Sequence, residues 1–290
     1  MHEFFLKLLA RGPVVTDGAW GTQLQARGLP LGHPPDAWNL SRPDRVEEVP
    51  RAYVEAGSRI ILTNTFQANR LSLAGHGLGD RTEEINRTGV EISRRAGGET
   101  AKVFASIGPT GKMLLTGETT EEELLSVFRE QAESLAAAGP DALVIETMSD
   151  LAEAKLALAA AKDTGLPVVV CMVFDSGKDN DRTMMGATPE QVAEELAAAG
   201  ADAIGANCGQ GPATYVDICR RLHAACDRPI WIKANAGLPQ MDGDKVVYAT
   251  TPAEFGEYAP ALIEAGAQFV GGCCGTSPEF IKALKEAIGP

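Results

Sequence analysis

Eight short apolar stretches rich in β-branched residues recur along the chain, each followed by more polar sequence, much of it with helical spacing. They span residues 14–20, 59–66, 102–109, 141–147, 167–174, 203–209, 229–237 and 269–275. Continuous apolar runs are typical of parallel strands that are covered on both faces. Alternation of strand and helix predicts parallel βαβ units, and eight such units predict a closed (β/α)8 barrel of the TIM type. We therefore expect an α/β protein with one domain over residues 1–290.

Helix boundary signals favour the same alternation. Helices are predicted over residues 121–138, 149–164, 188–199 and 278–288. Thr120, Thr188 and Ser277 stand where N-caps are expected, and Gly139 and Gly200 follow two of the helix ends. The alternative is an open, doubly wound sheet. It is weakened because no G-x-G-x-x-G pattern follows the first predicted strand.

The charge balance narrows the possible partners. Lys and Arg number 26 against 39 Asp and Glu, which gives a formal net charge of −13. Binding to nucleic acid or to an anionic membrane surface needs a basic face, so we expect neither kind of partner. No apolar stretch reaches the roughly 20 residues of a transmembrane helix, and the first residues do not resemble a signal peptide. We expect a cytoplasmic protein.

Polar, glycine-rich and cysteine-rich sequence gathers where the predicted strands end. These segments are residues 17–22, 63–66, 106–111, 146–147, 207–209, 233–237 and 271–276. In (β/α)8 barrels the active residues lie at the carboxyl ends of the strands. The barrel prediction and the distribution of reactive residues therefore point to the same end of the molecule.

The chain has six cysteines, too few in 290 residues for a disulfide-stapled scaffold. Three of them are expected to pack as small hydrophobic side chains, namely Cys171, Cys219 and Cys226. Cys208 ends the sixth predicted strand, and Cys273 and Cys274 end the eighth. The ends of these strands converge at one mouth of a barrel. Three thiolates with the fourth tetrahedral position open are typical of catalytic zinc.

The adjacent pair raises a geometric difficulty. Neighbouring residues of a strand point to opposite faces, so Cys273 and Cys274 cannot both face inward from a regular strand. Gly271, Gly272 and Gly275 flank the pair and would let the backbone leave the strand there. From spacing alone, a zinc site, a vicinal disulfide and two unrelated packed thiols are all open interpretations, because the pair lacks the C-x₂-C spacing.

These motifs resemble the homocysteine S-methyltransferase family. Its zinc-binding pattern is matched by Asn-Cys-Gly at 207–209 and by Gly-Gly-Cys-Cys-Gly-Thr at 271–276. Further matches fall at residues 17–23, 63–66, 108–111, 146–150, 205–209 and 233–237, so the resemblance covers nearly the whole chain. The segments at 108–111 and 235–237 resemble the homocysteine-binding domain of cobalamin-dependent methionine synthase more than the betaine-dependent branch.

The resemblance implies roles for individual residues. Cys208, Cys273 and Cys274 would bind Zn²⁺ and act in catalysis through it. Asp17 and Glu146 would lie near the ammonium group of homocysteine, which needs carboxylate partners when it is buried. The other residues expected in the substrate site are Asn64, Thr65, Ser106, Gly108, Thr110 and Asn235. Among these, backbone N–H groups of the 108–111 turn would hold the substrate's carboxylate, and Asn235 would be a labile fourth zinc ligand.

The implied reaction is transfer of a methyl group to the thiol of homocysteine, which gives methionine. A free thiol, with a pKa of about 8.5, is mostly protonated at neutral pH, and zinc deprotonates it. Three thiolate ligands leave high electron density on a fourth sulfur, whereas three neutral histidines would suit water activation. The expected donor is methylcobalamin on a corrinoid protein or on cobalamin and folate modules. S-methylmethionine, S-adenosylmethionine and betaine are alternative donors, and another thiol is an alternative acceptor.

Other functions stay open on the sequence. A desolvated Lys233 on the seventh predicted strand would suit a Schiff-base aldolase. The turn at 271–272 would suit the phosphate site found in many barrels. A zinc-dependent carrier of a thiol amino acid would need no methyl transfer. A betaine donor would need an aromatic cage, for which the candidates are Trp20, Trp38, Tyr53, Phe66 and Phe174.

Overall fold

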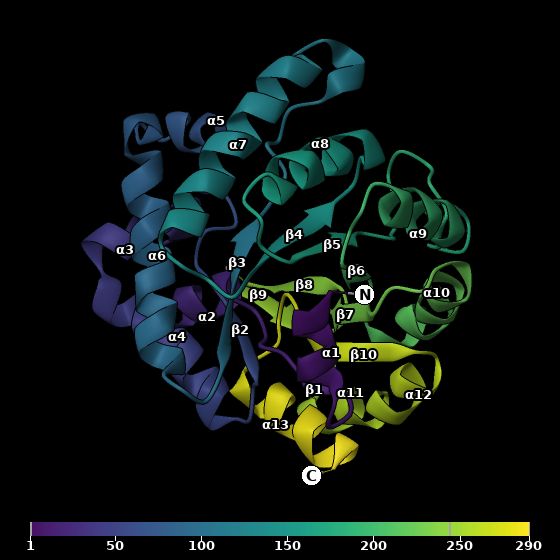
Figure 1. Ribbon diagram of the computed structural model, residues 1–290. Helices are drawn as coiled ribbons and strands as arrows, with labels where there is room; N and C mark the ends of the chain where they lie inside the picture. Colours follow the sequence, from purple (N-terminus) through teal and green to yellow (C-terminus); the bar gives the residue numbers. More distant parts are fainter. Residues whose placement is uncertain (1, 244, 290) are drawn as a thin grey trace.

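Eight parallel strands pair side by side into a barrel surrounded by helices (Figure 1). The computed structural model describes residues 2–243 and 245–289, so Met1, Asp244 and Pro290 of the predicted domain lie outside the described residues. The sheet order is β1-β10-β7-β6-β5-β4-β3-β2. The strands are β1 (Val14–Val15), β2 (Ile60–Leu62), β3 (Lys102–Ile107), β4 (Ala142–Met148), β5 (Val168–Met172), β6 (Ala203–Cys208), β7 (Ile230–Ala234) and β10 (Ala267–Gly272). The predicted (β/α)8 barrel is confirmed, and each predicted stretch overlaps one of these strands, although β4 ends one residue later and β10 begins two residues earlier than predicted.

The barrel closes between its first two strands partly through a side chain. The Arg59 N–H donates to the Val15 carbonyl at 2.8 Å. Farther along, the Leu62 N–H donates to Oδ2 of Asp17, also at 2.8 Å, where a longer β1 would have offered a backbone carbonyl. Asp17 is thereby fixed at the carboxyl end of the barrel.

Helices cover the outside of the barrel. The α-helices are α1 (Glu3–Leu9), α2 (Gly21–Ala26), α3 (Trp38–Ser41), α4 (Pro43–Glu55), α5 (Arg70–Ala74), α6 (Thr82–Gly97), α7 (Glu121–Ala137), α8 (Leu151–Lys162), α9 (Pro189–Ala198), α10 (Pro212–Ala225), α11 (Pro252–Glu257), α12 (Ala259–Glu264) and α13 (Pro278–Ile288). Short 3₁₀ turns are η1 (Pro35–Ala37), η2 (Gly79–Arg81) and η3 (Leu114–Thr116). Among the described residues, no helix combines the length and the apolar character that crossing a membrane requires.

The four predicted helices correspond to α7, α8, α9 and α13. Thr120 caps α7 by accepting the Glu123 N–H, as its position predicts. Thr188 caps α9 in a capping box with Gln191. Ser277 occupies the N-cap position of α13 as predicted, but its side chain makes no capping bond. Its hydroxyl donates to the Glu279 carboxylate two residues on instead.

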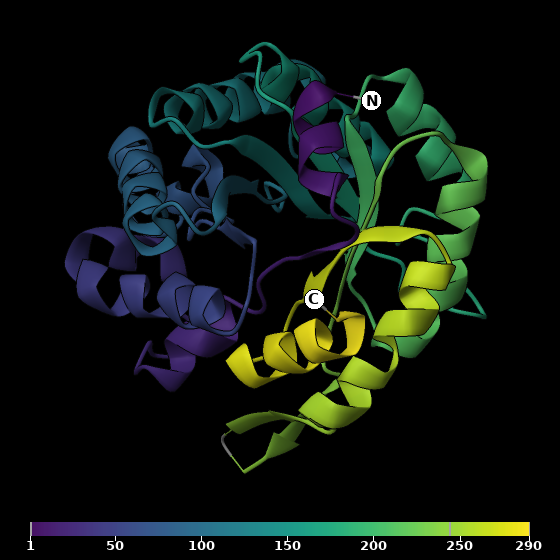
Figure 2. The ribbon, with the colours of Figure 1, turned by 60° about the horizontal axis from the view of Figure 1, so that its bottom comes forward.

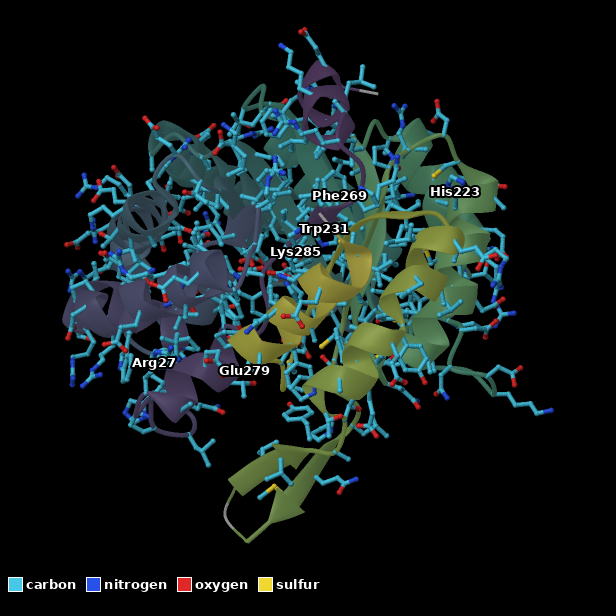
Figure 3. All side chains as sticks on the ribbon, turned by 90° about the horizontal axis from the view of Figure 1, so that it is seen from below. Arg27, His223, Trp231, Phe269, Glu279 and Lys285 are labelled. Carbon is cyan, nitrogen blue, oxygen red and sulfur yellow. The ribbon has the colours of Figure 1, made fainter. Side chains whose placement is uncertain are left out.

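The strands carry two apolar layers because alternate residues face opposite ways. Outward residues pack against the helices in one large core. Inward residues form a second core at the amino end of the barrel. There Trp231 stacks on Phe104 with ring centroids 5.7 Å apart and packs against Phe269 at 5.1 Å. Figure 3 shows Trp231 and Phe269 close together inside the barrel.

Helix α1 closes the barrel at the end where the strands begin (Figure 2). Phe5 of this helix is buried and meets the rings of Phe104 and Phe269 edge to face, at 6.2 and 5.6 Å. The amino end of the barrel is thus filled by aromatic side chains. The carboxyl end is left free to form a cavity.

A β-hairpin that the sequence did not predict follows β7. It consists of the antiparallel strands β8 (Pro239–Asp242) and β9 (Lys245–Tyr248). The hairpin projects from the body of the molecule (Figures 2 and 3). Tyr248 at its end returns to the barrel, where its ring lies against Gly275.

Gly205 on β6 has no room for a side chain. A Cβ there would lie 1.9 Å from the carbonyl oxygen of Trp231 on the neighbouring strand. We predict that Gly205→Ala lowers the free energy of unfolding by about 1–3 kcal/mol, because the strands must separate to admit the methyl group. Urea denaturation measures this. Gly21→Ala is the matched control, since a Cβ on Gly21 would have no neighbouring atom within 4 Å. Equal losses in the two variants would contradict the prediction.

Candidate metal centre and substrate cavity

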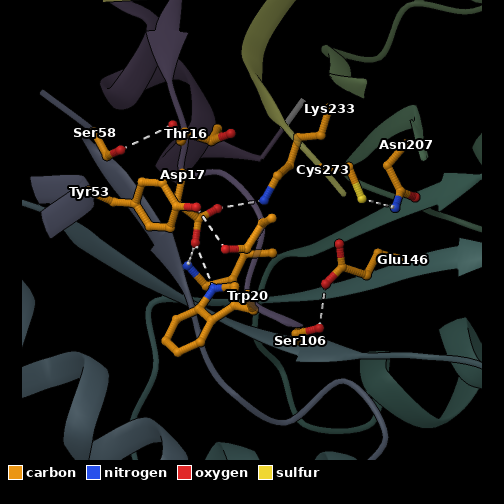
Figure 4. Close-up of polar contacts among 12 residues, drawn as sticks. Thr16, Asp17, Trp20, Tyr53, Ser58, Ser106, Glu146, Asn207, Lys233 and Cys273 are labelled. Carbon is orange, nitrogen blue, oxygen red and sulfur yellow. Dashed lines mark hydrogen bonds and ion pairs between the residues drawn. The ribbon is translucent and has the colours of Figure 1, made fainter. Parts of the chain in front are cut away.

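Functional side chains stand directly above the inner aromatic layer. Residues two positions further along a strand point into the barrel nearer its carboxyl end. Lys233 follows Trp231 on β7, and Ser106 follows Phe104 on β3 in this way. Glu146 continues the inward face of β4. Figure 4 shows these three side chains converging from different strands.

Three thiols come together at this end of the barrel. The Sγ atoms of Cys208, Cys273 and Cys274 all lie within 4.8 Å of one another. Those of Cys208 and Cys274 are 4.0 Å apart. A tetrahedral zinc with Zn–S bonds of about 2.3 Å has sulfurs about 3.8 Å apart. The cluster therefore has the donor type and the spacing that zinc requires.

The backbone leaves the strand between the two adjacent cysteines, as the glycines predict. Strand β10 ends at Gly272, and the Cys273 N–H still donates to the Ala234 carbonyl at 2.7 Å. Cys274 then lies in a turn that Gly275 continues with φ +82°. All six cysteines are free, so the interpretation as a vicinal disulfide is wrong. The proximity of Cys208 also rules out two unrelated packed thiols.

Cys208 is held in a backbone conformation that is rare for its residue type. Its φ is +68°, and Thr147 at the end of β4 has φ +63°. Such left-handed residues persist only where their surroundings fix them, and they cluster at functional sites. Asn207 supplies part of that fixing, because its amide accepts the Thr147 N–H and donates to the Thr147 hydroxyl, both at 2.7 Å. It also donates to Sγ of Cys273 at 3.8 Å (Figure 4).

The thiols share charge within the cluster. Hydrogen bonds from Cys208 and Cys274 lower the pKa of the Cys273 thiol well below its ordinary value. Hydrogen bonds with Cys273 and Cys274 raise the pKa of the Cys208 thiol. The cluster therefore favours the thiolate form at Cys273 over that at Cys208. A divalent cation would stabilise the two further thiolates that the thiols themselves resist forming.

Asp17 and Lys233 form a buried ion pair beside the cluster. Nζ of Lys233 lies 2.5 Å from Oδ1 of Asp17, and both side chains are almost wholly inaccessible. Oδ2 of Asp17 accepts the indole N–H of Trp20 at 2.9 Å and the Leu62 N–H (Figure 4). Both carboxylate oxygens thus have protein partners. Burial lowers the pKa of Lys233, but Asp17 and Glu146 outweigh it and raise the pKa overall.

Glu146 is the second buried carboxylate. Its Oε1 accepts the Ser106 hydroxyl at 2.5 Å. Burial raises its pKa to about 7, although Lys233 and Ser106 act in the opposite direction. The carboxyl group therefore changes its charge near neutral pH. Unlike Asp17, it lies on the wall of a cavity.

That cavity holds about 270 Å³ and opens at the carboxyl end of the barrel. Its wall includes the three thiols, together with Glu146 and Lys233. Of the residues predicted for the substrate site, Glu146, Asn64 and Ser106 line it, while Asp17, Thr65, Gly108, Thr110 and Asn235 do not.

The residues behind the wall mostly hold those on it. Thr65 donates its hydroxyl to the Ser106 carbonyl at 2.7 Å. The Gly108 N–H donates to the Phe66 carbonyl, and the Thr110 N–H donates to Glu153, each at 2.8 Å. Because these two N–H groups are engaged within the protein, they do not offer the substrate's carboxylate the bonds that we predicted for the 108–111 turn.

Asn235 carries an unpartnered acceptor beside the thiols. Its Nδ2 donates to the Gly209 carbonyl at 2.7 Å, and its backbone N–H donates to the Cys208 carbonyl at 3.1 Å. Its Oδ1 is buried and has no hydrogen-bond partner among the residues that the structure describes. Buried polar atoms are normally satisfied, so this oxygen fits a ligand for a cation.

Sequence reasoning misses several contributors. It treats Asn207 only as part of a motif and Lys233 only as a nucleophile. It considers Tyr53 only for an aromatic cage and gives Thr276 no individual role. Period-two spacing from the aromatic layer would have placed Lys233 and Asn207 inside the barrel. The contacts of Thr276 and Tyr53 depend on loop geometry, for which the sequence carries no comparable signal.

The fold and the site define a (β/α)8 barrel protein with a three-thiol cluster at the carboxyl ends of its strands. A family model described as Homocysteine S-methyltransferase matches residues 14–288, and the chain belongs to that family. The description of that family names a methyltransferase activity.

Relatives of known name agree with this assignment. Methionine synthase of Mycobacterium leprae is 30% identical over 99% of this chain, and that of Mycobacterium tuberculosis is 30% identical over 98%. The chain spans only 25% of the length of each. Among solved structures, the metallated form of the homocysteine methyltransferase MmuM from Escherichia coli is 25% identical, with a TM-score of 0.83, over 98% of this chain and 99% of that one. The carboxyl transferase domain of Rhizobium etli pyruvate carboxylase, at 13% identity and a TM-score of 0.58 over 99% of this chain and 49% of that one, shares the fold alone.

Proposed function

We propose that this protein transfers a methyl group to the thiol of homocysteine and so forms methionine. The observation that carries the proposal is one cavity lined both by three clustered thiols and by a buried carboxylate, Glu146. A thiol amino acid has a sulfur for one end of such a cavity and an ammonium group for the other. The free cysteines fit the reducing cytoplasm predicted from the composition.

Zinc is the metal that we propose for Cys208, Cys273 and Cys274, with Asn235 as a fourth ligand when no substrate is present. The sulfur spacing and the unpartnered Oδ1 of Asn235 both fit it. When bound there, zinc lowers the pKa of a thiol in its fourth position and leaves the resulting thiolate nucleophilic. The metallated form of the related MmuM also supports a metal in this family.

The chain's own residues position the acceptor. Glu146 receives the ammonium group, and Ser106 fixes the orientation of its carboxylate through the 2.5 Å hydrogen bond. Asp17 keeps Lys233 protonated and in place from behind the cavity wall. The sulfur of homocysteine then attacks the methyl carbon, the bond from that carbon to the donor breaks, and the thiol proton passes to solvent.

Methylcobalamin on a corrinoid protein or module is the donor that we propose. The cavity of about 270 Å³ suits an amino acid but not a corrin ring, so such a donor would react at the mouth. The methionine synthase relatives, of which this chain spans a quarter, favour it. S-methylmethionine or S-adenosylmethionine is the second candidate, favoured by the match to MmuM along nearly the whole of both chains.

Two alternatives receive less support. Of the five aromatic candidates for a betaine cage, only Trp20 and Phe66 line the cavity. A Schiff-base aldolase needs a neutral lysine, but the carboxylates around Lys233 raise its pKa and keep it charged.

A donor panel tests the function. Methylcobalamin, S-methylmethionine, S-adenosylmethionine and betaine are each supplied with homocysteine, and methionine is measured by mass spectrometry. We expect methionine to form when methylcobalamin is the donor. We also expect the protein to contain about one equivalent of zinc per chain, as a single metal site predicts. Turnover only with a sulfonium donor would replace the proposed donor. Zinc binding without methionine from any donor would favour the carrier interpretation.

The cysteine cluster can be separated from the other cysteines by mutation. Cys208→Ala, Cys273→Ala and Cys274→Ala should each lose bound zinc and at least about 100-fold in turnover, since even groups that only support metal ligands contribute about 10- to 100-fold. Atomic absorption and the methionine assay measure both. Cys226→Ala is the control, because its thiol lies outside the cluster and donates to the Leu222 carbonyl. Full zinc content in any of the three variants would refute the ligand assignment.

The charge of Glu146 predicts a pH dependence. Its pKa of about 7 means that the carboxylate is present above that pH and is lost as the pH falls through it. Affinity for L-methionine, which has the ammonium group but no titrating thiol, should therefore weaken between about pH 8 and about pH 6. Glu146→Gln should bind it about 10- to 100-fold more weakly, with a flat pH profile and unchanged zinc content. Calorimetry measures the affinity. An unchanged slope in the variant would contradict the assignment.

A further inference from the structure

Two loops of the site meet at one buried hydroxyl. The substrate loop, residues 17–22, follows β1 and runs into the first residues of α2, and its residues 18–22 line the cavity. The thiol loop, residues 273–276, follows β10 and carries two of the three thiols. Thr276 is wholly buried where these loops touch.

The Thr276 side chain bonds to both loops at once. Its Oγ1 accepts the Ala19 N–H of the substrate loop at 3.0 Å. The same hydroxyl donates to the Cys273 carbonyl of the thiol loop at 2.7 Å. One oxygen therefore fixes the position of a cavity-lining residue relative to a thiol-bearing residue.

The surroundings admit little other than this arrangement. A Cβ on Gly18 would lie 2.7 Å from Oγ1 of Thr276, and one on Gly272 would lie 2.3 Å from it. Two glycines, one beside each loop contact, thus make room for the threonine. Neither could be replaced without displacing the hydroxyl that joins the loops.

Further hydrogen bonds hold the two loops in place. The Tyr53 hydroxyl donates to the Ala19 carbonyl at 2.7 Å. The Gly275 N–H donates to the Thr22 hydroxyl at 3.2 Å. The substrate loop is consequently bonded to the thiol loop at two points, Thr276 and Thr22.

We propose that Thr276 is a positioning residue that couples metal binding to amino-acid binding. A metal held by Cys273 and Cys274 would fix the thiol loop, and Thr276 would transmit that order to the substrate loop. The amino acid then binds to a loop that is already ordered, so its affinity rises, and by linkage its binding strengthens metal retention. The inference rests on the proposed function in taking the amino acid to be homocysteine and the metal to be zinc.

The test uses L-norleucine, which has the backbone of a sulfur amino acid but no sulfur to bind zinc. Its dissociation constant is measured by calorimetry with zinc-loaded protein and with reduced, zinc-free protein. We expect wild-type protein to bind norleucine about fivefold or more tightly when zinc is loaded. Thr276→Val, which keeps the shape and loses both hydrogen bonds, should bring the ratio close to one. Thr276→Ser, which retains the hydroxyl, should restore it.

Controls separate coupling from a general loss of structure. Ser58→Ala removes a buried hydroxyl that donates to the Thr16 carbonyl, outside both loops, and should leave the ratio unchanged. Thr22→Val removes the second link between the loops and should lower the ratio of norleucine affinities in part. This variant tests the coupling if Thr276→Val fails to fold. Zinc affinity is measured by competition with a chelator. Without norleucine, Thr276→Val should bind zinc as tightly as wild-type protein does, and with norleucine it should bind zinc more weakly than wild-type protein.

Three outcomes would overturn the inference. One is a wild-type ratio of one, another is an unchanged ratio in the folded threonine variants, and the third is an equal change in Ser58→Ala. Failure of the proposed function has a different signature, because wild-type protein would then bind neither homocysteine nor norleucine with zinc present.

Discussion

The buried pair of Asp17 and Lys233 is the interaction on which the rest of the site depends. Two charges without access to water persist only when each is fully partnered, and removing one partner from such a pair costs about 3–5 kcal/mol. Here the carboxylate also accepts a backbone N–H from β2 and the indole N–H of Trp20. The pair therefore joins β1, β2 and β7 across the barrel and sets the floor of the cavity. Glu146, near the end of β4, is left as the carboxylate that lines the cavity and has room for an external cation.

The aromatic layer below explains why that pair can be so dry. Trp231, Phe104 and Phe269 fill the barrel from wall to wall, and Phe5 of α1 seals it from the other end. The polar layer above it is correspondingly buried, and this burial raises the pKa of Glu146 to about 7.

The sequence predicted the barrel and the three thiols because both follow from local patterns. Apolar runs that alternate with helices have few packed arrangements, and a strand-end position places Cys208 near Cys273 whatever the loops do. The role of the 108–111 turn could not be predicted in this way. Whether the N–H groups of Gly108 and Thr110 face the substrate or the protein depends on Phe66 and Glu153, which approach from other elements. The hairpin after β7 was missed for a similar reason, since its short strands pair only with each other.

Two residues of the site have strained backbone conformations. Cys208 and Thr147 adopt left-handed backbone conformations that cost about 1–3 kcal/mol each. The hydrogen bonds of Asn207 hold Thr147, and Tyr215 donates to the Asn207 carbonyl at 2.6 Å from the helix behind. A thiol pointed by such a backbone cannot relax away from its two neighbours, even though three clustered thiols resist losing their protons together. The fold thus sets the position of Cys208 in advance, so that a cation entering the cluster has to displace protons and to fix only the loop that carries Cys273 and Cys274.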